Sequence, residues 1–94
     1  MYRIVLSCSE VPMKAGEEAA IDITGEFAEH RKWHRSVKCT WDGSSLFLEA
    51  CNEYDSDGTA LIDEFSDCVS AFVSEGFDGG IRIESITEIP EDGT

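Results

Sequence analysis

The fold of this chain is decided by residues 37–51, which read VKCTWDGSSLFLEAC. Apolar and polar residues alternate from Val37 to Trp41, which is the period of a strand with one buried face. Asp42 and Gly43 then predict a tight turn, because glycine adopts the positive φ that hairpin turns require. A second strand-like segment, Leu46–Cys51, follows. We therefore predict a β-hairpin, and we expect the rest of the chain to cover one of its faces.

The segments on either side of the hairpin complete the predicted element order. Tyr2–Cys8 and Ile81–Ile89 read as strands. Helices are predicted over Lys14–Trp33 and from Thr59 to about Ser74, where apolar residues recur with the helical period. The order is then β-α-β-β-α-β. This is the order of the ferredoxin-like α+β fold, a four-stranded antiparallel sheet with two helices on one face.

The first helix carries the pattern that supports its assignment. Acidic residues crowd its front and basic residues its end, which matches the helix dipole. The apolar positions form one stripe: Ala15, Ala19, Ala20, Ile23, Phe27 and His30. The alternation from Ile21 to Thr24 is the competing signal, and it would suit a strand instead.

Length and composition suit one folded domain over residues 1–94, with 90–94 expected as a frayed tail and 76–80 as a glycine-rich loop. The start of the chain reads as a strand, and no apolar run approaches the ~20 residues of a membrane span, so a cytoplasmic protein is expected. The four cysteines have no C-x-x-C spacing, and we interpret them as buried thiols rather than disulfides or zinc ligands: Cys8, Cys39, Cys51 and Cys68.

The charge distribution is the strongest functional signal in the sequence. The chain has 20 acidic and 7 Lys or Arg residues, a formal net charge of −13. Residues 1–41 hold six acidic and six basic residues, whereas residues 42–94 hold the other fourteen acidic residues and only Arg82. Such a surface repels nucleic acid and anionic membranes and attracts basic partners.

A set of carboxylates on and before the second helix is the candidate partner-binding site: Glu53, Asp55, Asp57, Asp63, Glu64 and Asp67. A folded array of carboxylates can imitate the charge of a nucleic-acid backbone. We therefore expect a non-catalytic inhibitor that occupies the nucleic-acid site of a basic protein. Immunity proteins of nuclease toxins and phage inhibitors of CRISPR systems are similar in being small acidic domains. The bland alternative is a charged surface that only keeps the domain soluble.

Residues 53–64 also resemble the calcium loop of an EF-hand. Glu53, Asp55, Asp57, Gly58 and Glu64 fall at loop positions 1, 3, 5, 6 and 12. A strand is predicted before this loop, where an EF-hand has a helix. The alternative is an ordinary strand-to-helix loop with acidic capping residues, so no metal is assigned.

Three weaker signals remain. His30 and His34, four apart on the predicted helix, could share a face and hold zinc with a third ligand. Basic residues near Trp33 could form a small nucleic-acid patch, or could contact the protein's own acids: Arg31, Lys32, Arg35 and Lys38. A small structural dimer through an open sheet edge is the last alternative. The spacing of Cys and His specifies no nucleophile and base, so neither an enzyme nor a cofactor is expected.

Overall fold

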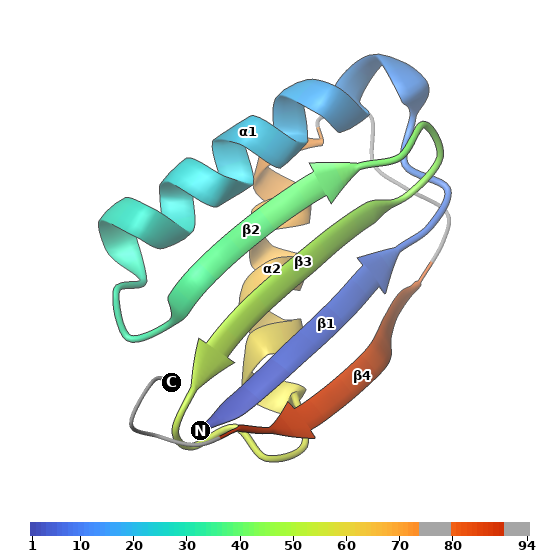
Figure 1. Ribbon diagram of the computed structural model, residues 1–94. Helices are drawn as coiled ribbons and strands as arrows, with labels where there is room; N and C mark the ends of the chain where they lie inside the picture. The colour runs from blue at the N-terminus through green and yellow to red at the C-terminus, as the bar shows by residue number, and fades with distance from the viewer. Residues whose placement is uncertain (74–79, 90–94) are drawn as a thin grey trace.

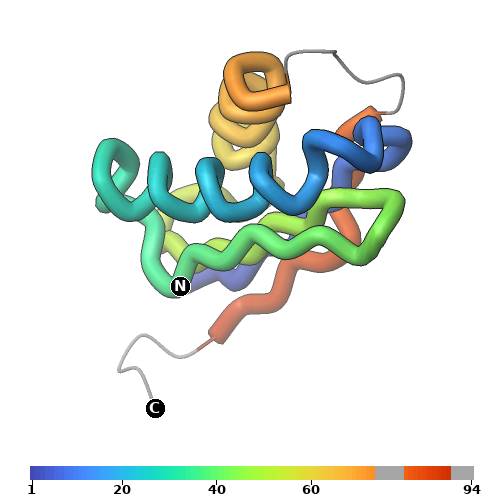
Figure 2. Tube along the Cα trace, turned by 90° about the horizontal axis from the view of Figure 1, so that it is seen from above, coloured from blue at the N-terminus to red at the C-terminus, as the bar shows by residue number. Residues whose placement is uncertain are grey.

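The computed structural model describes residues 1–73 and 80–89. The six elements, in chain order, are β1 (Tyr2–Cys8), α1 (Met13–His30), β2 (Arg35–Trp41), β3 (Leu46–Asn52), α2 (Thr59–Phe72) and β4 (Ile81–Glu88). Figure 1 shows the four strands as one sheet, and Figure 2 shows both helices on the same side of it. The predicted β-α-β-β-α-β order is confirmed.

The sheet has the strand order β2-β3-β1-β4, and every neighbouring pair is antiparallel. This is the ferredoxin-like arrangement that the element order predicts. The hairpin is confirmed as well, with Trp41 opposite Leu46 in the register. Its turn depends on Asp42, whose carboxylate accepts hydrogen bonds from the backbone N–H groups of Ser44 and Ser45 at 2.9 and 2.8 Å. Gly43 has the expected positive φ, at 104°.

The first helix is shorter than predicted. It ends at His30, and the backbone N–H of Arg31 donates to the carbonyl of Phe27 as the last helical bond. The competing strand over Ile21–Thr24 is wrong, because this segment lies inside α1. His30 is also not part of the buried stripe: its side chain is 65% exposed, since the stripe meets the core only as far as Phe27.

The second helix and the last strand lie close to their predicted positions. α2 begins after Gly58, which has a left-handed backbone with φ of 78°, and ends at Phe72. Its predicted end near Ser74, most of the glycine-rich loop, and the predicted frayed tail at 90–94 lie outside the described residues. Along residues 1–73 and 80–89, neither helix is long and apolar enough to cross a membrane.

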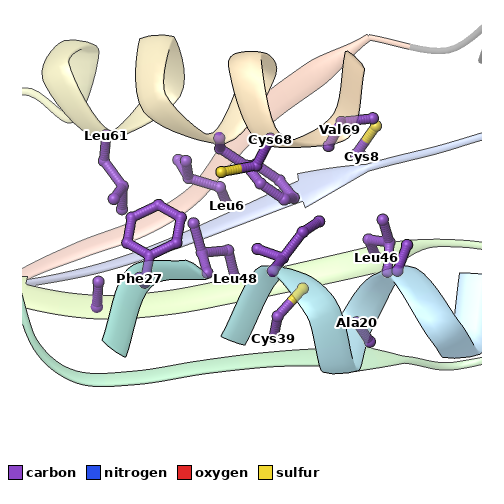
Figure 3. Packing of buried hydrophobic residues seen from close by; sticks show 14 of the residues in the cluster. Leu6, Cys8, Ala20, Phe27, Cys39, Leu46, Leu48, Leu61, Cys68 and Val69 are labelled. Atoms are coloured by element: carbon purple, nitrogen blue, oxygen red, sulfur yellow. The ribbon is translucent and has the colours of Figure 1, made fainter. Parts of the chain in front are cut away.

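The core fills the space between the helices and the sheet. Figure 3 shows side chains of both helices and the sheet meeting there, among them Phe27, Leu48 and Leu61, all fully buried. All four cysteines are buried and free, as the sequence indicates. Burial raises the pKa of the Cys8 thiol to about 11 and that of Cys39 to about 12. These thiols therefore stay protonated and pack as small apolar groups.

Gly16, in the second turn of α1, is required by the packing of Trp41. A Cβ atom at Gly16 would overlap the Trp41 indole, whereas a Cβ atom at Gly25 in the same helix would meet nothing within 4 Å. We expect Gly16→Ala to lower the free energy of unfolding by about 1–3 kcal/mol through overpacking. Gly25→Ala is the matched control and should raise it by about 0.5–1 kcal/mol. Urea unfolding followed by circular dichroism tests both, and a stabilising Gly16→Ala would contradict the packing.

The buried thiols make a second prediction, for alkaline pH. The unfolded chain loses thiol protons near pH 9.0, whereas folded Cys8 and Cys39 keep theirs to about pH 11 and 12. The unfolded state then binds fewer protons, so the free energy of unfolding falls as pH rises above 9, by about 1.4 kcal/mol per pH unit for each thiol. Urea unfolding at pH 8 to 10.5 measures this slope. Cys39→Ala should show a shallower slope, and an unchanged slope would contradict the assignment.

Candidate functional site: an acidic helix layer

The fold separates the charges of the chain by layer. The two helices carry eight acidic residues and one basic residue, Lys14, a formal charge of −7. The four strands carry four basic and three acidic residues, a formal charge of +1. The two helices cover the same face of the sheet (Figure 2), so their carboxylates gather on one side of the molecule. We call this surface the acidic helix layer.

α1 contributes a row of carboxylates that the sequence analysis missed: Glu18, Asp22, Glu26 and Glu29. Their spacing of three and four residues places them on one side of the helix. At Glu26 this row comes close to α2, because Arg31 lies 3.9 Å from Glu26 and 3.2 Å from Glu64 of α2. Counting charges by halves of the chain hid this row, since the basic residues that balance it lie in the following turn and in the strands.

The loop between β3 and α2 uses two of the predicted partner-binding residues for its own structure. The Asp55 side chain is buried, and its two carboxylate oxygens accept the backbone N–H groups of Ala60 and Leu61 at 3.2 and 2.9 Å. Asp57 accepts the backbone N–H and the hydroxyl of Thr59 at 3.2 and 2.8 Å. Both residues therefore cap the start of α2, and Asp55, only 4% exposed, has little surface to offer a partner.

Glu64 is likewise engaged inside the protein. Its carboxylate bonds Nε2 of His34 at 2.6 Å through one oxygen and the guanidinium of Arg31 at 3.2 Å through the other. On the other side of the imidazole, Nδ2 of Asn52 lies 3.2 Å from Nδ1 of His34. Oδ1 of Asn52 accepts the backbone N–H of Asp55, so Nδ2 is the atom that donates to His34. His34 therefore carries its proton on Nε2 and donates it to Glu64.

The other three predicted residues point to solvent. Glu53, Asp63 and Asp67 are exposed, and the two aspartates lie four residues apart on the outer side of α2. Together with the exposed carboxylates of α1, Asp63 and Asp67 form the exposed part of the acidic helix layer, whereas Glu53 lies in the loop before α2. The six residues singled out in the sequence thus divide into exposed charges and structural ones.

Neither of the two metal sites considered from the sequence, the calcium-like loop and the His30–His34 pair, has the geometry that was expected for it. Within the calcium-like loop, Asp55 and Glu64 are bonded to protein donors, and β3 rather than a helix precedes the loop. The prediction that His30 and His34 share a helix face is wrong, because α1 ends at His30 and His34 is buried beyond it. Over the described ranges, no three His, Cys, Asp or Glu side chains are grouped to hold a metal ion.

The predicted basic group is split by the fold. Arg31 bonds to Glu64, so its contact with the protein's own acids is confirmed. Lys38 lies opposite Glu49 on β3, on the sheet face away from the helices. Arg3 reaches the same Glu49 at 2.9 Å from β1. The basic side chains of the sheet therefore lie away from the acidic helix layer and do not neutralise it.

Comparisons with known proteins leave the site to be judged on its geometry. No protein-family model matches the chain, and no curated protein and no solved structure matches it.

The Glu64 contacts make a testable prediction about stability. Glu64→Ala would leave the buried Nε2–H of His34 and the Arg31 guanidinium without their acceptor, and we expect a loss of about 2–4 kcal/mol in the free energy of unfolding. Asp63→Ala removes an exposed carboxylate from the same helix and should change it by no more than about 0.5 kcal/mol. Equal losses in the two variants, measured by urea unfolding, would show that the buried contacts contribute nothing.

Proposed function

We propose that this protein is a non-catalytic inhibitor that binds a basic, nucleic-acid-handling protein through the acidic helix layer and occludes its nucleic-acid site. The observation that carries the proposal is the gathering of carboxylates from two helices on one face, where Lys14 is the one Lys or Arg within either helix and Arg31, just after α1, is paired with Glu64. This surface resembles a nucleic-acid backbone in its charge, and it is held in place by a folded core.

The geometry supports charge mimicry in two ways. The row from Glu18 to Glu29 extends about 16 Å along α1, given a rise of about 1.5 Å per residue. Asp63 and Asp67 add exposed charges from the neighbouring helix. Because the backbone that carries these carboxylates is already helical, binding a partner would require little further ordering of this protein, and the entropy cost would be small.

The net charge of −13 also favours fast association with a basic partner. A surface of one sign steers an oppositely charged protein toward it, and salt weakens that attraction. An inhibitor that competes with nucleic acid benefits from fast association, since it must bind its target before the nucleic acid does. The closest functional classes are nuclease immunity proteins and inhibitors of CRISPR systems, by analogy of charge and size.

The proposal is tested by charge reversal on α2. The protein is immobilised, exposed to lysate of its source cells and eluted with a salt gradient, and retained proteins are identified by mass spectrometry. We expect a nucleic-acid-binding protein that elutes at moderate salt and whose nucleic acid this chain displaces. Asp63→Lys combined with Asp67→Lys should weaken its binding about ten-fold or more, because like charges would then face each other.

The control carries the same change in net charge at a different place. Glu10→Lys combined with Glu88→Lys reverses two exposed acids outside the helices and should leave binding within about two-fold. Equal weakening by both pairs would mean that only net charge matters. If no nucleic-acid-binding protein is retained, or if the α2 variant binds it as well as the unchanged protein does, the proposal is wrong.

A further inference from the structure

Two large aromatic side chains are exposed at the end of the molecule where β2 begins and β3 ends. Trp33 precedes β2 and Tyr54 follows β3. The two residues are 53% and 55% exposed. The pairing of Arg35 with Cys51 brings the two segments to the same end of the sheet. Exposing large aromatic rings to water is unfavourable, and Trp and Tyr are enriched among the residues that contribute most to protein interfaces.

His34 holds both aromatic side chains in position. Its ring centroid lies 5.9 Å from that of Trp33 and 6.2 Å from that of Tyr54. The imidazole itself has no exposed surface and is bonded through both ring nitrogens, to Glu64 and Asn52. Both aromatic rings therefore pack against a buried, hydrogen-bonded imidazole, and binding a partner there would require little further ordering.

Two carboxylates, those of Glu64 and Asp55, act on the hydroxyl of Tyr54. Burial is the first cause that raises the pKa of its hydroxyl, and the charges of Glu64 and Asp55 raise the pKa further, whereas a contact with Trp33 acts in the opposite direction. Glu53 precedes it in the chain and is exposed. Arg31 is already engaged by Glu64, whereas Lys32 and Arg35, on either side of Trp33 in the chain, are exposed. An aromatic face beside carboxylates is the environment in which a guanidinium group binds well.

We propose that Trp33 and Tyr54 form an anchor that receives an arginine side chain of the basic partner, with the guanidinium stacked on the aromatic rings and Glu53 beside it. The anchor rests on the proposed function, because it names the chemistry by which the same partner is held. It adjoins the acidic helix layer through Glu64, which links the end of the sheet to α2. The aromatic rings would add a contribution that salt screens less than the carboxylates do.

The experiment uses a hexa-arginine peptide and a hexa-lysine peptide as probes, titrated by calorimetry into the whole protein at low and moderate salt. Both peptides carry the same charge, so a difference between their affinities reports the guanidinium group rather than simple attraction, and the alanine variants of the two aromatic residues show how much of that difference is stacking. We expect hexa-arginine to bind more tightly than hexa-lysine. Trp33→Ala and Tyr54→Ala should each weaken hexa-arginine by about two- to five-fold and reduce the preference for it.

Two controls separate the anchor from general effects. Ile21→Ala removes an exposed apolar side chain of α1, 69% exposed, and should leave both affinities unchanged. Trp33→Phe keeps an aromatic face and should retain part of the preference. Equal binding of both peptides, or unchanged hexa-arginine binding in the alanine variants, would overturn the anchor and leave the acidic helix layer standing. Binding of neither peptide would overturn both proposals.

Discussion

The handedness of its two crossover connections determines how this molecule is built. β1 connects to the parallel strand β2 through α1, and β3 connects to the parallel strand β4 through α2, each crossover passing over the strand between. Because such crossovers are right-handed, both helices must lie on the same face of the sheet (Figure 2). One face of the sheet is thereby buried and the other left open. The gathering of helix carboxylates follows from the same constraint.

Charge separation between the layers is the electrostatic consequence of this arrangement. In the linear sequence, the acidic residues of α1 are balanced by basic residues within a few positions. In the fold, the basic residues apart from Lys14 lie outside the helices, either in the turn after α1 or on the open face of the sheet. On that face, Arg3 pairs with Glu49 and Lys38 lies opposite it. The helices keep the acids. A chain whose first 41 residues are neutral thus has a strongly negative helix surface.

The polar contacts at the end of the sheet connect the acidic helix α2 to the rest of the fold. Glu64 connects α2 to the turn after α1 by bonding His34 and Arg31, and Asn52 connects the same imidazole to the end of β3. Buried polar groups of this kind are costly when they lose a partner, so the network favours one arrangement of these three segments. It also fixes the exposed rings of Trp33 and Tyr54, which would otherwise sit on independent loops.

The sequence by itself determined the elements, their order and the buried hairpin, because apolar periodicity and turn residues are local properties. It also placed Asp63 and Asp67 on or close to the second helix. Only the tertiary structure decided that Asp55 and Glu64 are structural and that the α1 carboxylates belong to the acidic surface. The end of α1 at His30 and the packing of Trp41 on Gly16 were decided in the same way. The contacts of Glu64 and the packing of Trp41 on Gly16 join residues far apart in the chain, and such contacts leave no periodic signal in the sequence.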